Sequence, residues 1–251
     1  MPAEKEPNFF AADENWQRGA AWYESFFAEA RSEKAVGEAS TTYSKFPVIR
    51  EVPARMARVL DMAHLRLLYI VRHPIDRMVS HHLHRWYEGE AGPSLAATLE
   101  ADPQMLACSR YYQQIEQYLP FVSPEQWLVV VFEEFVADTA AVHKAVFEFL
   151  GVDLNFVPRD LAPKNVTSSK VRRAGWAEAL RRISLIQRAA RHLVPEKIRI
   201  RLTRSADRRP DKPAIPPALY NRLLEELMPD VSALSDFAHR DFAKIWGLEA
   251  R

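Results

Sequence analysis

Three short, mostly apolar runs divide the chain into segments. They are AVGEA at residues 35–39, LRLLYIV at 65–71 and WLVVVF at 127–132. Apolar runs of four to eight residues between polar segments are typical of buried β-strands. The pattern therefore predicts three strands.

Helical spacing of apolar residues fills the intervals between these runs. In residues 138–150 the apolar residues recur on one helical face, Asp138 can cap the start and Gly151 can end the helix. Further helices are predicted at residues 16–31, 53–62, 74–88, 109–119, 174–192, 217–228 and 231–243.

Strands that alternate with helices predict an α/β fold, in which crossover helices join parallel strands and cover both faces of the sheet. A chain of 251 residues can bury one substantial core, so we expect a single domain over residues 1–251. Within it, residues 174–212 are expected to form a basic helical insertion or loop. The proline-rich string at residues 208–217 predicts a connection to the last helices.

The overall formal charge of +1 conceals a strongly basic segment. Residues 170–212 hold 14 Lys or Arg against 4 Asp or Glu, a net charge of +10. Such a segment is either a solvated helical face or a contact surface for a polyanion. Within it, residues 181–209 permit an amphipathic helix, and we expect peripheral contact with an anionic membrane or polysaccharide there, and no nucleic-acid partner.

Composition excludes several classes of protein. No apolar run reaches the roughly eighteen residues of a membrane span, and the polar start MPAEKEPN is unlike a secretory signal, so we expect a cytoplasmic location. Cys108 is the single cysteine, which excludes an intrachain disulfide and a cage of several thiolates. We expect Cys108 to be a buried, inert thiol.

The stretch LLYIVRHPIDRMVSHHLHRW, residues 67–86, carries the clearest chemistry. The second apolar run ends on Arg72, and ligands of parallel sheets bind beyond the carboxyl ends of the strands. In the helix that follows, Arg77, Ser80, His81 and His84 share one face. Guanidinium and hydroxyl groups bind phosphate, so the stretch indicates a phosphate site, with surface charges on an amphipathic helix as the alternative.

RHPIDRMVSHHLH, residues 72–84, resembles the 3′-phosphate-binding segment of the sulfotransferases that use 3′-phosphoadenosine 5′-phosphosulfate (PAPS), especially the heparan sulfate branch and its bacterial relatives. Further similarity follows in the family's order along the chain, in KEPNFF (5–10), NWQRGAAWYESFF (15–27), GEASTTY (37–43), SRYYQQIEQYL (109–119) and NVTSSKVRR (165–173). The resemblance implies a P-loop-NTPase-like, three-layer α/β fold. It also implies transfer of a sulfuryl group from PAPS to a hydroxyl or amine, with a carbohydrate as the expected acceptor.

The resemblance also implies roles for individual residues. Arg72 and Ser80 match the pair that holds the 3′-phosphate, and Glu6 matches the base that takes the acceptor's proton. Lys5 and His84 are expected to contact the acceptor. The family's loop over the nucleotide matches four further residues, Ser169, Lys170, Arg172 and Arg173.

Three histidines are the competing candidates for the base, because imidazole titrates near neutral pH. These are His81, His82 and His84, which we interpret as helix-surface or acceptor-groove residues. Their spacing differs from His-Glu-x-x-His, so no metal site is expected.

One element of the family pattern has no counterpart in this sequence. The family begins with a strand and a Gly-rich turn carrying Lys and Ser or Thr, whereas the seven glycines here include no Gly-x-x-x-x-Gly-Lys arrangement. We therefore expect the first, loop-bearing strand to be missing from the sheet. Two alternatives stay open: a truncated, non-catalytic relative that binds a 3′-phosphorylated nucleotide at most, and a small-molecule kinase.

Overall fold

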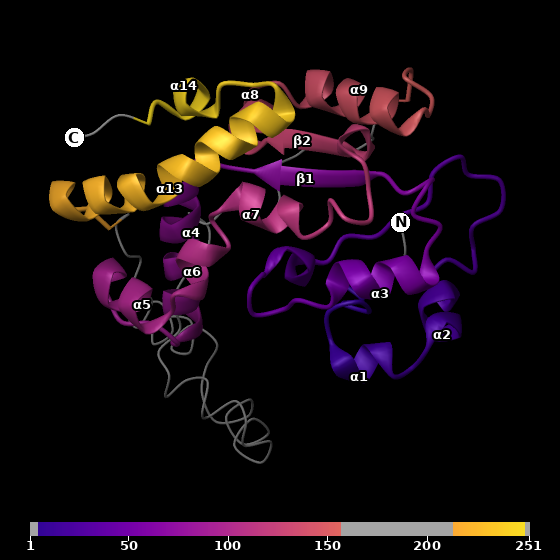
Figure 1. The fold of residues 1–251 in the computed structure, drawn as a ribbon, viewed down its shortest axis with the longest axis horizontal. Helices are drawn as coiled ribbons and strands as arrows, with labels where there is room; N and C mark the ends of the chain where they lie inside the picture. The colour runs from indigo at the N-terminus through magenta and orange to yellow at the C-terminus, as the bar shows by residue number, and fades with distance from the viewer. Residues whose placement is uncertain (1–4, 157–212, 249–251) are drawn as a thin grey trace, which may run out of the picture.

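A two-stranded parallel sheet lies at the centre of the protein (Figure 1). The computed structural model describes residues 5–156 and 213–248. Strand β1 (Leu67–Val71) pairs with β2 (Trp127–Val131) in a register that places Leu67 opposite Trp127 and Val71 opposite Val131. Both strands therefore end at the same edge of the sheet, where α4 and α8 begin.

Helices occupy most of the remaining described chain. Before β1 they are α1 (Asp13–Trp16), α2 (Ala20–Ser25), the 3₁₀ helix η1 (Thr41–Ser44) and α3 (Val52–Val59). Between the strands they are α4 (Pro74–Glu88), α5 (Leu95–Ala101), α6 (Gln104–Ala107), α7 (Tyr111–Glu116) and the 3₁₀ helix η2 (Pro124–Gln126). After β2 they are α8 (Phe132–Ala137), α9 (Thr139–Leu150), α13 (Pro217–Ala238) and α14 (Phe242–Trp246).

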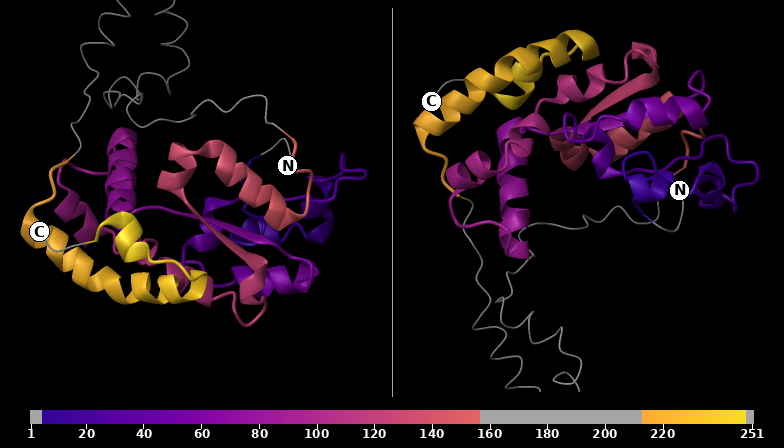
Figure 2. Two further views of the ribbon diagram at one scale, coloured as in Figure 1. Left: turned by 90° about the horizontal axis from the view of Figure 1, so that it is seen from above. Right: turned by 60° about the horizontal axis from the view of Figure 1, so that its bottom comes forward.

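The elements form an α/β fold with helices on both sides of the small parallel sheet, as the alternation of strands and helices predicts. Figures 1 and 2 show α7 along one side of the strands and α8 and α9 along the other. Residues far apart in sequence meet on the α7 side, where the rings of Tyr69 and Tyr111 pack edge to face at 5.8 Å. The crossover from β1 to β2 through α4–α7 is what allows two consecutive strands to run parallel.

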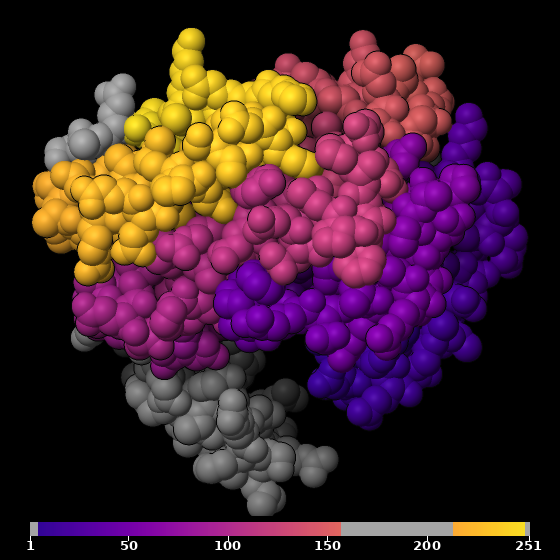
Figure 3. Space-filling model, in the orientation of Figure 1, coloured from indigo at the N-terminus to yellow at the C-terminus, as the bar shows by residue number. Residues whose placement is uncertain are grey.

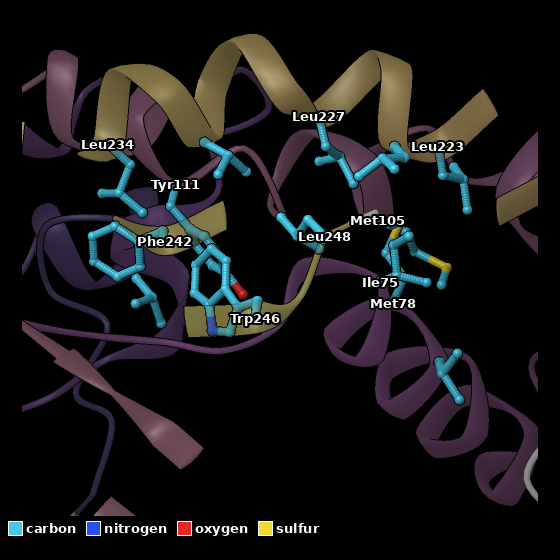
Figure 4. Close-up of a cluster of buried hydrophobic side chains, with 14 of the residues drawn as sticks. Ile75, Met78, Met105, Tyr111, Leu223, Leu227, Leu234, Phe242, Trp246 and Leu248 are labelled. Carbon is cyan, nitrogen blue, oxygen red and sulfur yellow. The ribbon is translucent and has the colours of Figure 1, made fainter. Parts of the chain in front are cut away.

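The largest buried cluster joins α4, α7, α13 and α14 (Figure 4). Ile75 and Met78 of α4 meet Leu227 of α13, while Phe242 and Trp246 of α14 close the cluster beside Tyr111. A second cluster is built around the fully buried Phe9 and Phe10. These clusters fix the two walls between which the candidate site lies.

The predicted strand at residues 35–39 is wrong. The segment forms no strand in the structure, and Val36 is exposed. The run is interrupted by Gly37 and Glu38, so it offers few side chains to a buried sheet. A strand needs a neighbour for its backbone groups, and short apolar runs alone do not supply one.

The sheet also departs from the expectation that both faces are covered. Val71 is buried, but Leu68 and Ile70, which alternate with it toward the opposite face, are 43% and 57% exposed. The side chains of β1 therefore alternate between the two faces of the sheet, as they do in any strand. In the described part of the chain, other residues cover one of these faces of β1 only incompletely.

Two helix predictions need correction. The helix expected at residues 16–31 is replaced by the short α1 and α2, which are separated at Gly19 with φ of 80°. The two helices expected at 217–228 and 231–243 are instead one long helix, α13, followed by α14. Helix α13 continues through Pro229 because Leu227, Val231 and Leu234 are buried on both sides of the proline, and this packing outweighs the lost hydrogen bond.

Asp230 links α13 to α7, and the orange-to-yellow surface of α13 adjoins the pink surface of the α7 region in Figure 3. Its carboxylate accepts the backbone N–H groups of Tyr112 and Gln113 at 3.0 and 2.8 Å, at the beginning of α7. We expect Asp230→Ala to lower the free energy of unfolding by about 1–3 kcal/mol, because two helix-terminal amides lose their acceptor. Urea denaturation would measure this loss.

The matched control is Asp236→Ala, an exposed aspartate of the same helix with no hydrogen bond or ion pair to the described residues. It should change the free energy of unfolding by less than about 0.5 kcal/mol. Equal effects of the two substitutions would contradict the capping role of Asp230.

Candidate active site

A cavity of about 1020 Å³ opens beside the residue that follows β1. Its walls come from four segments: the chain around Glu6, the η1 region with Thr41 and Lys45, the start of the crossover with Arg72 and Ser80, and residues 101–108 with Asp102 and Cys108. The structure thus brings three sequence-predicted site residues, Glu6, Arg72 and Ser80, to one hollow. This is the position beyond the carboxyl ends of parallel strands where ligands bind.

Arg72 is held by its backbone at the tip of β1. The hydroxyl of Tyr111 donates to the Arg72 carbonyl at 2.7 Å and lies 3.2 Å from the Arg72 backbone N–H, for which it is the acceptor. The buried α7 tyrosine therefore fixes where the arginine leaves the strand. Burial raises the pKa of Tyr111, which keeps the hydroxyl protonated and able to donate.

The Arg72 side chain is only partly satisfied by protein groups. Its guanidinium lies over the Phe132 ring at 5.1 Å, and its Nε is 3.9 Å from a Glu133 carboxylate oxygen, beyond hydrogen-bonding distance. Nε is buried and has no hydrogen-bond partner in the described part of the chain. The Arg72 side chain is nevertheless 35% exposed and lines the cavity, so its guanidinium is accessible to an incoming anion.

Glu133, the second residue of α8, was not singled out by the sequence pattern. One of its carboxylate oxygens accepts the His73 backbone N–H at 3.0 Å, and the other lies 3.4 Å from the Trp246 indole nitrogen. Glu133 thus ties the turn after β1 to the C-terminal helix and lies next to Arg72.

Helix α4 carries the polar wall of the cavity. It starts at Pro74, where the missing N–H is no loss, and the His73 ring accepts the Asp76 N–H at 3.3 Å. Ile75 and Val79 are buried on one face. The opposite face presents its polar side chains to the cavity, namely Arg77, Ser80, His81, His84, Arg85 and Glu88.

Three further cations that the family pattern did not assign line the cavity, namely Lys45, Arg77 and Arg85. Arg77 donates from Nη1 to the buried Ser109 hydroxyl at 3.3 Å, and its side chain lines the cavity. Lys45 stands on the facing wall and makes no ion pair within the described residues. The spacing of Arg77 on the face of Ser80 was visible in the sequence, whereas Lys45 gave no local signal.

The Glu6 side chain is exposed and reaches the same cavity. Thr41 donates from Oγ1 to Glu6 Oε2 at 3.1 Å, across 35 positions of sequence. Its neighbour Lys5, expected to contact the acceptor, is exposed but does not line the cavity. The geometry therefore separates these two adjacent residues.

The three candidate histidines have different environments. His82 is 2% exposed and its Nδ1 lies 2.9 Å from the Thr98 hydroxyl, so its interpretation as a surface or groove residue is wrong. His81 and His84 line the cavity. Burial lowers the pKa of His81, and the Arg77 charge lowers it further, so His81 favours the neutral form.

The end of the cavity farther along α4 is rich in polar groups. Arg85 forms an ion pair with Asp102, and its Nε is 3.5 Å from a Glu90 carboxylate oxygen. These two carboxylates neutralise the charge of Arg85. His84 lies 3.4 Å from Glu88. Cys108, at the cavity wall, is buried as expected, and this burial raises the pKa of its thiol.

The remaining predicted residues fall outside the described residues. They are the four residues of the loop expected over the nucleotide, namely Ser169, Lys170, Arg172 and Arg173. The same holds for the basic segment at 174–212 and its amphipathic part at 181–209. In the part that the structure does describe, no helix is both long and apolar enough to cross a membrane.

These features define an α/β protein with a cavity at the carboxyl edge of a parallel sheet that is lined by arginine, carboxylate and hydroxyl side chains. The chain belongs to the sulfotransferase family, whose model matches residues 3–155. The matched range contains Glu6, Arg72 and Ser80 and ends before the predicted nucleotide loop. The sequence pattern left a small-molecule kinase open as an alternative, and family membership decides in favour of the sulfotransferase.

A solved structure supports the fold. The crystal structure of a sulfotransferase from Alicyclobacillus acidocaldarius superposes with a TM-score of 0.65 at 24% sequence identity, covering 98% of this chain and 87% of that one. Comparison with curated proteins gave no match.

Proposed function

We propose that the protein transfers a sulfuryl group from PAPS to a hydroxyl or amine of a carbohydrate acceptor. The observation that carries this proposal is the convergence of Arg72, Ser80 and Glu6 on one cavity, although Glu6 is 66 positions before Arg72 in the chain. Membership in the sulfotransferase family supports the reaction class. The sulfuryl donor and the carbohydrate acceptor are those that the resemblance to PAPS-dependent sulfotransferases implies, and the chemistry of the cavity supports them.

The residues present fit a nucleotide with a 3′-phosphate. The partly exposed guanidinium of Arg72 offers charge-assisted hydrogen bonds, and Ser80 lies on the next helix with a directional hydroxyl donor. Arg77 and Lys45 add positive charge to the same hollow. PAPS would supply the activated sulfuryl group, and these cations would stabilise negative charge on its phosphates and on the departing bisphosphate.

Glu6 would act as the general base in this reaction. Its Oε2 is engaged by Thr41, which leaves Oε1 for the proton of the acceptor hydroxyl. As that proton moves to Glu6, the acceptor oxygen forms a bond to sulfur and the bond from sulfur to the 5′-phosphate oxygen breaks. His81, kept neutral by burial, is the alternative base within the cavity.

The acceptor assignment draws on the far end of the cavity. Glu88, Asp102 and Gln104 present carboxylate and amide groups there, beside His84. Such groups accept and donate hydrogen bonds to several hydroxyls at once, which suits a sugar. The predicted contact of residues 181–209 with an anionic membrane or polysaccharide, and the predicted nucleotide loop at 169–173, complete the proposal.

Calorimetry with two nucleotides tests the donor assignment. Adenosine 3′,5′-bisphosphate should bind the full chain at least roughly 30-fold more tightly than adenosine 5′-monophosphate, which corresponds to about 2 kcal/mol for the contacts of the 3′-phosphate. Equal affinities would defeat the assignment. Tight bisphosphate binding without transfer of labelled sulfate to any carbohydrate or amine in a panel would instead favour the non-catalytic alternative.

A further inference from the structure

Three consecutive hydroxyl residues form a run whose contacts all reach the same distant segment. The run is Ser40, Thr41 and Thr42, and the segment extends from Glu6 to Asn8, at least 32 positions earlier. The resemblance to the sulfotransferases assigned none of these three hydroxyl residues a role. Their contacts nevertheless converge on the residue proposed as the base.

Each member of the hydroxyl run makes a different hydrogen bond. Thr41 donates to the Glu6 carboxylate at 3.1 Å, Ser40 accepts the backbone N–H of Asn8 at 3.0 Å, and Thr42 donates to the Asn8 side-chain oxygen at 2.5 Å. Asn8 in turn donates from Nδ2 to the Glu6 carbonyl at 2.7 Å. The backbone and the carboxylate of Glu6 are therefore held from separate directions.

The backbone of this segment needs such support. Glu6 and Asn8 have φ angles of 53° and 49°, in the left-handed region that non-glycine residues rarely adopt. Asparagine tolerates this region better than glutamate does. Strained backbone of this kind persists only where the surroundings hold it in place, and it is concentrated at functional sites.

Both ends of the hydrogen-bonded unit are anchored. Phe9 and Phe10, directly after Asn8, are completely buried in the second core cluster. On the other side, Ser40 donates to Glu38 Oε2 at 3.0 Å, so its hydroxyl hydrogen is engaged and its lone pairs face the Asn8 N–H. Burial raises the pKa of Glu38, and the hydrogen bonds that its carboxylate receives, including the one from Ser40, oppose that rise.

We propose that Thr41 is a positioning residue that aims the Glu6 carboxylate into the cavity, with Ser40 and Thr42 fixing the backbone behind it. The inference rests on the proposed function, since it takes Glu6 as the base. Thr41 binds one oxygen of the carboxylate and so decides which oxygen faces the acceptor. Because the Thr41 side chain is exposed, it adds little to the core.

The test uses Thr41→Val, which keeps the shape of the side chain but removes the hydroxyl, and Thr41→Ser, which keeps the hydroxyl. With labelled PAPS and the best acceptor of a carbohydrate panel, the valine variant should lose about tenfold in kcat, the size expected for one hydrogen bond to a charged group. Thr41→Ser should retain at least half of kcat. Neither variant should change the melting temperature or the affinity for adenosine 3′,5′-bisphosphate.

A second readout needs neither nucleotide nor acceptor. Ser40→Ala removes the acceptor of the Asn8 N–H, so the Asn8 amide hydrogen should exchange with solvent at least tenfold faster. The amide hydrogens within α4, at the Arg72 and Ser80 wall, should keep their exchange rates. Unchanged exchange at Asn8 would overturn the backbone part of the proposal.

The outcomes separate this inference from the proposed function. If Glu6→Gln is inactive while Thr41→Val turns over like the unmodified protein, the positioning role is overturned and the proposed reaction stands. If Glu6→Gln stays active, both the base assignment and the inference that rests on it are overturned. If Thr41→Val lowers the melting temperature, or weakens nucleotide binding as much as it lowers kcat, Thr41 has a structural role and the proposal is overturned.

Discussion

Replacing Arg72 by alanine is expected to weaken the binding of adenosine 3′,5′-bisphosphate by about 2 kcal/mol or more, roughly 30-fold. Arg72 leaves the tip of β1 with its backbone fixed by Tyr111 and with Nε buried and unpaired within the described chain. The side chain as a whole is 35% exposed and lines the cavity, where a ligand phosphate can approach the guanidinium. Isothermal titration calorimetry on the full chain gives the affinity directly.

Arg110→Ala is the matched control. The two arginine side chains are equally exposed, at 35%, and each has a glutamate nearby: Glu133 for Arg72 and Glu226, at 3.6 Å, for Arg110. Arg110 does not line the cavity, so its removal should leave nucleotide affinity within about twofold of the original value. Equal losses for the two variants would indicate a general electrostatic effect and argue against a specific phosphate contact.

The affinity for adenosine 5′-monophosphate provides a further check on the Arg72 contact. Arg72→Ala should change it far less than it changes the affinity for the 3′,5′-bisphosphate, because the ligand lacks the group that Arg72 is proposed to hold. A parallel loss for both nucleotides would place Arg72 at another part of the ligand.

The part of the site nearest to β1 could be predicted from sequence because it is local. Arg72 follows an apolar run and precedes a proline, and α4 begins and ends at the predicted residues 74 and 88. The helical period then places Ser80 on the same face as Arg77. This wall of the cavity is formed by one strand and the helix that follows it, so the periods of the strand and the helix are enough to predict which side chains share it.

The facing wall could not be predicted in the same way. Thr41 and Lys45 reach the cavity only because the chain folds back so that η1 lies beside Glu6 and Asn8. The apolar character of residues 35–39 instead predicted a strand, which the structure does not form. Contacts across more than 30 positions depend on tertiary packing, which no local pattern of apolar residues encodes.

The long helix α13 is a second feature that local sequence patterns do not predict. Pro229 predicts a break, but α13 runs through it while its buried leucines stay in contact with α4 and α7. A local preference of about 3 kcal/mol against proline inside a helix is outweighed when several large side chains are buried on either side of it. The acceptor of two α7 amides, Asp230, lies directly after the proline.

Replacing Glu6 by glutamine is expected to lower turnover by a factor on the order of 10²–10⁴, the usual contribution of a general base, with nucleotide affinity nearly unchanged. Glutamine keeps the size of the side chain and can still accept the Thr41 hydroxyl, but it cannot take the acceptor's proton. Transfer of labelled sulfate measures turnover, and calorimetry with adenosine 3′,5′-bisphosphate measures the affinity.

Glu14→Gln, an exposed glutamate of α1 outside the cavity, is the control and should leave both quantities unchanged. If Glu6→Gln retains turnover, the proton must go elsewhere, and His81 is then the residue to replace, because it lines the same cavity and burial favours its neutral, proton-accepting form. Replacing each candidate base distinguishes Glu6 from His81. If His81→Asn is inactive while Glu6→Gln is fully active, the base lies on α4. The N-terminal segment then has a role in acceptor binding alone.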